Sequence, residues 1–157
     1  MKNIRKVYDG FFNLIENICV VFLAGMVIIC AYSVFMRYVM KAAPRWGDEM
    51  ALFCMVWYGL LSAAVALKED RHIRIRLWEN WLSPKANKIL EVIIHVVVLA
   101  VLLWFFKWAV ALTSLAGATV MTGSQLPMKY LYVAEPVAVF CMIIAAIGRI
   151  GEICGNC

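Results

Sequence analysis

Four apolar stretches, separated by segments that hold nearly all of the charge, constrain this chain most strongly. They cover residues 17–36, 50–67, 92–112 and 133–148. The hydrocarbon core of a bilayer is about 30 Å thick and takes about 20 helical residues to cross, whereas a barrel strand needs about 10. A soluble domain of 157 residues cannot bury four helices that are apolar on every side. The sequence therefore predicts an all-α integral membrane protein with four transmembrane helices.

The distribution of basic residues predicts how these helices are oriented. The chain holds 15 Lys and Arg against 10 Asp and Glu, an excess that would suggest a nucleic-acid partner only in a soluble protein. Cytoplasmic loops of membrane proteins carry more Lys and Arg than outer loops. With the N-terminus inside, ten of these residues fall in inner segments, Lys107 lies within the third span, and four fall outside, at Arg37, Lys41, Arg45 and Lys129. We expect both termini in the cytoplasm and no nucleic-acid partner.

The chain is predicted to form a single four-helix membrane domain over residues 1–157, and start and stop signals mark the ends of its helices. Pro44 prevents the first helix from continuing, and Ser83 followed by Pro84 favours the start of the third. The first apolar run is too long for a signal peptide and is expected to remain as an anchor. The predicted helices cover about residues 14–37, 48–68, 84–116 and 130–149.

Two further segments are amphipathic and predict helices that lie flat on the inner membrane surface. Residues 3–13 precede the first span, and residues 72–82 form an interfacial helix between the second and third spans. Aromatic and basic side chains near helix ends are expected to anchor the protein at the lipid interface. These membrane-interface anchors are Trp46, Trp78, Trp81, Lys107, Tyr130 and Tyr132.

Polar residues inside the predicted spans offer no obvious chemistry. His95 follows Glu91 by four residues and is interpreted as a hydrogen-bonded packing residue, because a metal site needs more ligands. Cys154 and Cys157 form a C-x-x-C pair, which alone is a weak signal for zinc or redox chemistry. We expect no catalytic, cofactor-binding or metal-binding residue, and no ion path within this chain.

Residues at the ends of the helices resemble a known family over about residues 5–150. The order of these residues along the chain is Arg37-Tyr38, Trp46, Asp48-Glu49, Trp57, Gly59, Asp70-Arg71-His72-Ile73-Arg74-Ile75, Leu126-Pro127, Tyr130 and Pro136. It resembles the small membrane subunit of tripartite ATP-independent periplasmic (TRAP) transporters. Glu135 before Pro136 departs from the family pattern, and the family does not explain the Cys154–Cys157 tail.

The resemblance implies a multi-pass protein of the bacterial inner membrane that is not an enzyme. Its partners would be a large multi-helix TRAP membrane subunit, a periplasmic solute-binding protein and the lipid bilayer. In the family, the large subunit carries the substrate and sodium sites and moves like an elevator, while the small subunit is a static scaffold that contributes to docking of the binding protein. The implied process is secondary active uptake of a small organic anion by sodium symport.

Two groups of residues are candidates for contacts with these partners. For docking of the binding protein they are Arg37, Lys41, Arg45, Asp48 and Glu49, although Arg37 could equally reach lipid phosphate, and Asp48 and Glu49 could complement the start of the second helix. For the interface with the large subunit they are Trp57, Gly59, Ser62 and Ala63, with packing inside the chain as the alternative.

Two other functions are alternatives for a chain with four spanning helices. A stand-alone proton-coupled carrier of four helices would need a carboxylate deep in the first span. Glu16 is the only candidate, and it precedes the apolar run. A membrane thiol oxidoreductase would use cysteine pairs in the outer loops, and residues 37–49 and 117–132 contain no cysteine. The sequence favours the transporter subunit over both.

Overall fold

The computed structural model describes residues 2–69 and 84–155, and this part of the chain is almost entirely helical. Four of its helices are long and apolar enough to cross a membrane. This confirms the prediction of an all-α protein with four long apolar helices. The elements are α1 (Lys2–Tyr38), α2 (Gly47–Lys68), α3 (Pro84–Leu115), the 3-10 turn η2 (Ala116–Ala118), α4 (Lys129–Tyr132) and α5 (Ala134–Gly155).

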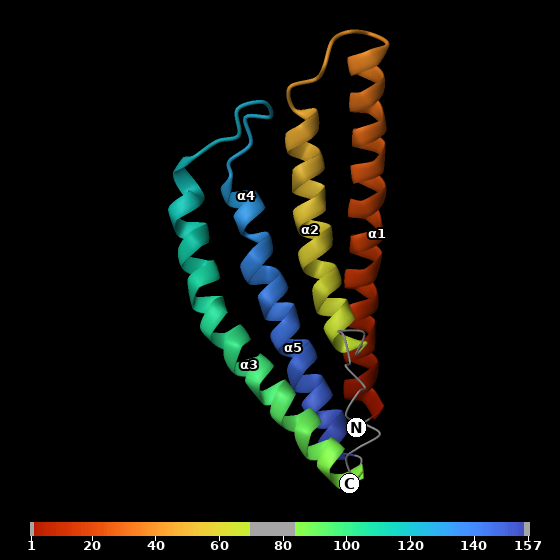
Figure 1. The fold of residues 1–157 in the computed structure, drawn as a ribbon, viewed down its shortest axis with the longest axis vertical. Helices are drawn as coiled ribbons and strands as arrows, with labels where there is room; N and C mark the ends of the chain where they lie inside the picture. Colours follow the sequence, from red (N-terminus) through yellow and green to blue (C-terminus); the bar gives the residue numbers. More distant parts are fainter. Residues whose placement is uncertain (1, 70–83, 156–157) are drawn as a thin grey trace.

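The long helices lie side by side in an order that differs from their order along the chain. Helix α1 packs on α2, α2 packs on α5, and α5 packs on α3 (Figure 1). The first residues of α1 and the last of α5 lie at the same end, which we call the terminal end. Residues 39–46 and 119–128 lie at the opposite end, which we call the loop end (Figure 1).

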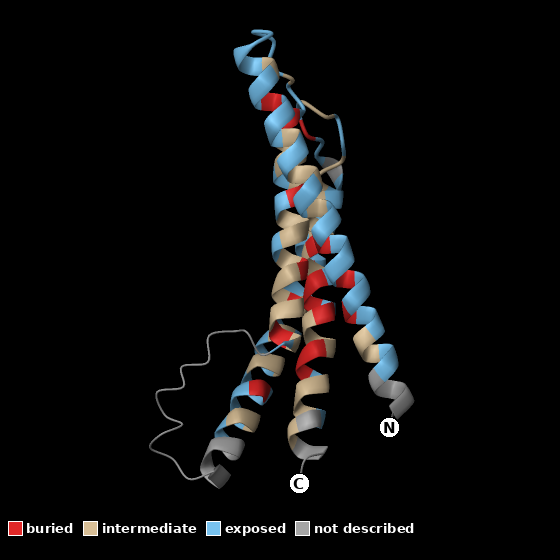
Figure 2. Cartoon of the chain, turned by 90° about the vertical axis from the view of Figure 1, so that its right-hand side faces the viewer, coloured by how far each residue is buried: buried red, intermediate tan, exposed pale blue. Residues whose placement is uncertain are grey.

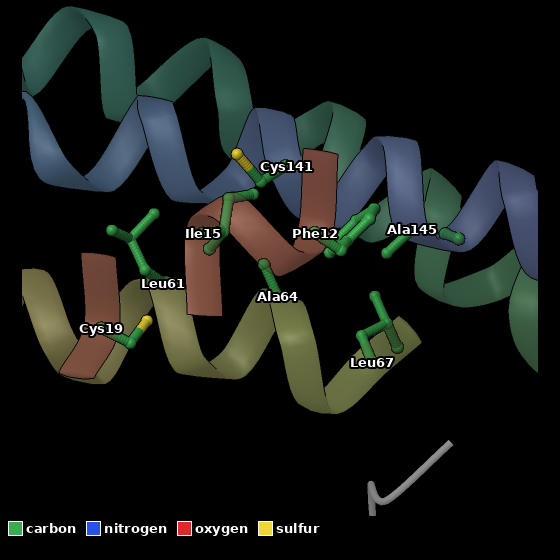
Figure 3. Packing of buried hydrophobic residues seen from close by; sticks show 9 residues of the cluster. Phe12, Ile15, Cys19, Leu61, Ala64, Leu67, Cys141 and Ala145 are labelled. Atoms are coloured by element: carbon green, nitrogen blue, oxygen red, sulfur yellow. The ribbon is translucent and has the colours of Figure 1, made fainter. Parts of the chain in front are cut away.

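The core of the bundle lies toward the terminal end, where buried positions gather (Figure 2). Small side chains let helix backbones approach closely, and this close packing is what holds helices together in lipid. Ala64 of α2 and Ala145 and Ala146 of α5 are fully buried in this cluster, which Phe12 of α1 fills with a large ring (Figure 3). The rest of the cluster is Ile15, Cys19, Leu61, Leu67 and Cys141.

Helix α1 is longer than a membrane span. Its 37 residues correspond to about 55 Å at 1.5 Å per residue. The sequence predicts a surface segment over residues 3–13 and a separate spanning helix over 14–37. The structure instead joins the two segments in one helix without a turn between them. The expectation of two separate segments is therefore corrected.

Contacts with two neighbouring helices explain why the first turns of α1 continue the helix. The hydroxyl of Tyr8 donates to the carbonyl of Ala145 at 3.4 Å, and a Cβ on Gly148 would lie 2.7 Å from the Tyr8 ring. Lys68, the last residue of α2, lies 3.1 Å from the carboxylate of Asp9. The apolar face of this segment therefore packs on α2 and α5.

Helices α2 and α3 have bounds close to the expected ones, whereas the fourth span is interrupted and ends later than residue 149. Helix α2 begins at Gly47, α3 ends at Leu115, and α5 continues to Gly155. The fourth span is divided at Val133 into α4 and α5. The predicted interfacial helix over 72–82, with Trp78 and Trp81, lies outside the described residues.

Proline chemistry accounts for the interruption between α4 and α5. In an α-helix each N–H donates to the carbonyl four residues earlier, and proline has no N–H. Pro136 therefore leaves the carbonyl of Tyr132 without its helical donor. The hydroxyl of Thr113, on α3, lies 3.2 Å from that oxygen and supplies a replacement. Side chains of this kind satisfy backbone groups that proline frees inside membranes.

Candidate functional site at the loop end

The first loop follows directly from the end of α1. Two backbone hydrogen bonds close the last turn of the helix, from Val39 to Phe35 at 2.9 Å and from Ala42 to Met36 at 3.2 Å. Lys41 then adopts a left-handed conformation with φ of 52°. The loop is therefore a tight turn that presents the side chain of Lys41 to the exterior.

The second loop, residues 119–128, folds back on itself as a short hairpin. The N–H of Met121 donates to the carbonyl of Leu126 at 2.9 Å, and the N–H of Met128 donates to Thr119 at 2.9 Å. Met121 of this hairpin is only 4% exposed.

Glu49, in the first turn of α2, joins the second loop to this helix. Its Oε1 accepts hydrogen bonds from the hydroxyl of Thr122 at 3.1 Å and from the N–H of Gly123 at 2.8 Å. Its Oε2 accepts from the N–H of Ser124 at 2.8 Å and from the hydroxyl of Ser124 at 2.9 Å. We call these four hydrogen bonds the Glu49 clasp. Bonds to a carboxylate are stronger than those between neutral groups.

A close backbone approach accompanies the clasp. A Cβ added to Gly123 would collide with the backbone carbonyl of Arg45 and lie 3.2 Å from the N of Trp46. Only glycine fits where two backbones meet so closely. The second loop therefore lies directly on the last residues of the first loop.

The five docking candidates differ in the contacts that they make in the structure. Arg37 and Asp48 form an ion pair at 3.3 Å, with side chains 54% and 80% exposed, and such surface pairs contribute only about 0–1 kcal/mol. Lys41 and Arg45 are exposed and form no ion pair with any residue that the structure describes. Glu49 is occupied by the clasp.

Trp57, a candidate for the interface with the large subunit, makes contacts within the chain. Its Nε1–H donates to the carbonyl of Tyr130 at 3.2 Å, so it fastens α4 to α2. Its ring stacks on Phe22 with centroids 5.7 Å apart and planes at 16°. These contacts agree with the alternative of packing inside the chain.

The other three candidates on α2 lie next to open space or are partly covered. Gly59 is exposed, and a Cβ added there would meet nothing within 4 Å. The hydroxyl of Ser62 donates to the carbonyl of Gly59 at 3.0 Å, and Ala63 is half-buried. Among the residues that the structure describes, none therefore covers the position of Gly59.

The described interface anchors lie on or near the outside of the bundle. Trp46 stacks on Tyr32 with centroids 6.0 Å apart, and Lys107 is exposed. Tyr130 is exposed beside Lys129, whose ammonium lies 5.3 Å from the ring centroid, while Tyr132 is half-buried. These positions suit side chains that meet the lipid interface.

The partners of Glu49 and Thr113 in the structure were not among the sequence predictions. The vacant carbonyl of Tyr132 can be inferred from Pro136 alone, because proline removes a known donor. Residues 122–124 offer several donors in a short turn, which is a signal for an acceptor nearby. Nothing in the sequence indicates that the acceptor is Glu49, 73 to 75 residues earlier.

Comparison with known proteins agrees with the resemblance. Residues 26–154 match the family described as tripartite ATP-independent periplasmic transporters, DctQ component. The chain is similar to the sialic acid TRAP transporter small permease protein SiaQ of Vibrio cholerae, at 24% identity over 63% of this chain and 56% of that protein. It is also similar to a candidate TRAP transporter small permease protein of Haemophilus influenzae, at 27% identity over 54% of this chain and 53% of that protein.

Each match thus spans little more than half the length of the relative. The match to the family covers most of the chain, including α2, α3, α4 and α5. Four apolar helices suit a multi-pass protein of the inner membrane, and the family consists of transporter subunits rather than enzymes. This chain belongs to the DctQ component family of tripartite ATP-independent periplasmic transporters, as a small membrane subunit of the transporter.

Proposed function

We propose that this subunit forms a static part of a TRAP transporter and that its loop end docks the periplasmic solute-binding protein. A large, sodium-coupled membrane subunit would carry the substrate, and the complex would take up a small organic anion. The relative from Vibrio cholerae is named as part of a sialic acid transporter, which supports that class of substrate. The observation that carries the docking proposal is the exposure of Lys41 and Arg45 at the loop end.

The docking proposal requires the loop end to face the periplasm. The excess of Lys and Arg in the other segments favours a cytoplasmic terminal end and a periplasmic loop end. Lys41 and Arg45 are basic residues at the periplasmic end and are therefore exceptions to this rule. Both are exposed, so contact with a periplasmic partner can explain their presence there.

The free charge of the first loop is positive. Arg37 and Asp48 neutralise each other, and Glu49 is held by four donors, so the free charges of the first loop are the positive charges of Lys41 and Arg45. They complement an acidic face on the binding protein. Exposed charges steer an encounter and fix its orientation more than they add affinity, and a binding protein must arrive, release its ligand and leave.

The test is uptake by vesicles that contain this subunit and its large subunit, measured against increasing binding-protein concentration. Lys41→Glu combined with Arg45→Glu is expected to raise the half-saturating concentration roughly tenfold at low salt. The change should shrink toward physiological salt, where exposed charges are screened beyond about 8 Å. Co-purification with the large subunit should be unchanged.

A matched control exchanges the two side chains by Lys41→Arg with Arg45→Lys, which keeps both charges and should leave the half-saturating concentration unchanged. Vesicles that contain the small subunit alone should show no sodium-driven uptake. If the double reversal to Glu does not alter the concentration dependence at low salt, the loop end is not the docking surface.

A further inference from the structure

We propose that Glu49 is a positioning residue, which holds the second loop beside Lys41 and Arg45 so that the binding protein contacts both loops. This inference rests on the proposed docking function. It changes the expected role of Glu49, from a charge that meets the partner to a group that shapes the surface.

The clasp leaves the carboxylate of Glu49 little capacity to attract a partner. Each of its two oxygens accepts two hydrogen bonds, all from residues 122–124. A partner cation would have to compete with four donors already in place. Asp48, which is 80% exposed, is the carboxylate of this turn that a partner can reach.

The second loop has the composition of a contact surface. Residues 116–128 contain no charged side chain. The hairpin presents exposed polar and apolar residues, namely Thr119, Val120, Gln125 and Leu126. Protein interfaces commonly combine a central area that is poor in charge with a polar, charged rim. Lys41 and Arg45 supply such a rim at the first loop.

Close contact between the loops makes them one surface. Gly123 lies on the backbone of Arg45, so a protein that binds the side chain of Arg45 meets the second loop at the same time. If the loop were free, it would occupy its docked position for only part of the time. The apparent affinity of a partner falls by the fraction of time that the competent position is occupied.

Two variants separate positioning from direct charge contact. Glu49→Ala removes the clasp together with its charge. Gly123→Ala keeps every charge but pushes the second loop away from Arg45, because the new methyl group has no room. Gly117→Ala is the matched control, since a Cβ at Gly117 meets nothing within 4 Å.

Three measurements are made on the complex with the large subunit. Hydrogen exchange reports whether the amides of Gly123 and Ser124, which donate to Glu49, are released. Uptake against binding-protein concentration reports docking. Co-purification reports assembly, and Ser124→Ala, which removes one hydrogen bond of the clasp, is a milder variant that decides the question if Glu49→Ala fails to assemble.

We expect Glu49→Ala and Gly123→Ala both to speed exchange in the second loop and to raise the half-saturating concentration about tenfold, which is about 1.4 kcal/mol. Uptake at saturating binding protein should be retained, and Ser124→Ala should give a smaller rise. Unlike the charge reversal of Lys41 and Arg45, the rise caused by Gly123→Ala should persist at high salt.

Each other outcome overturns the proposal. If Glu49→Ala weakens docking and Gly123→Ala does not, Glu49 contacts the partner through its charge. If both speed exchange and docking is unchanged, the second loop is outside the contact. If exchange is unchanged, the clasp does not hold the loop. In each case the reversal of Lys41 and Arg45 still tests the docking function independently.

Discussion

Thr113→Val is expected to destabilise the protein more when Pro136 is present than in a Pro136→Ala background. Pro136 cannot donate to the carbonyl of Tyr132, and the Thr113 hydroxyl lies 3.2 Å from that oxygen. Valine has nearly the shape of threonine without the hydroxyl, so the substitution leaves the carbonyl of Tyr132 without a donor. In a Pro136→Ala background the new backbone N–H can donate to this carbonyl. Thr113→Val should then lower the free energy of unfolding less.

The hydrogen bonds of Thr113 determine how strongly it should be coupled to Pro136. Thr113 has one hydroxyl hydrogen, and two carbonyls compete for it, since the oxygen of Ala109 lies 2.9 Å away. Hydrogen bonds between helices in membrane proteins contribute about 0.6 kcal/mol on average and at most about 1.7. We therefore expect Thr113 and Pro136 to be coupled by about 0.6 kcal/mol. The bond to Ala109 is lost in both backgrounds, so it cancels in the double-mutant cycle.

The assay is reversible unfolding of the four proteins of the cycle in mixed micelles with increasing SDS, followed by tryptophan fluorescence and circular dichroism. Replacing proline also changes the unfolded state, but the cycle removes that contribution. Distant, independent sites are additive within about 0.3–0.5 kcal/mol. If Thr113→Val costs the same free energy of unfolding in both backgrounds within that margin, Thr113 is not the replacement donor.

Two further predictions concern topology and assembly. A reporter that is active only in the periplasm should be active when fused after Lys41 and silent after Gly155, because basic residues favour a cytoplasmic terminal end; activity after Gly155 would reverse the orientation. Gly59→Leu should weaken co-purification with the large subunit without preventing membrane insertion, because it fills an open surface on α2, whereas Gly10→Leu, also at an open position, should have no effect. Equal co-purification of both variants would exclude Gly59 from the interface.

The apolar runs predict the four long helices because they are direct consequences of chain chemistry. A run such as residues 50–67 cannot expose its backbone to lipid, so its length already implies a helix close to α2 (Gly47–Lys68). The spacing of Tyr8, Phe12 and Ile15 likewise predicts an apolar helix face. Periodicity identifies a face but not what covers it, and in the structure α2 and α5 cover this one.

The partners of polar groups at the loop end could not be predicted in the same way. Asp48 and Glu49 are adjacent acidic residues in the same helical turn, and the sequence offers no reason to treat them differently. In the structure Asp48 meets Arg37 while Glu49 meets residues 122–124. This difference arises because neighbouring residues on a helix point in directions about 100° apart, and only the packing of α1 and the second loop determines what each one reaches.

The break between α4 and α5 bears on whether this subunit could move ions itself. Interrupted helices hold ions in many transporters, because unwound carbonyls near the middle of the membrane are free to coordinate them. Here the carbonyl that Pro136 vacates, on Tyr132, has Thr113 as a donor, and the carbonyl of Tyr130 accepts from Trp57. The break also lies at the loop end rather than at mid-span (Figure 1). Because these carbonyls fasten helices to each other instead of facing an ion, the break agrees with the proposal of a static subunit.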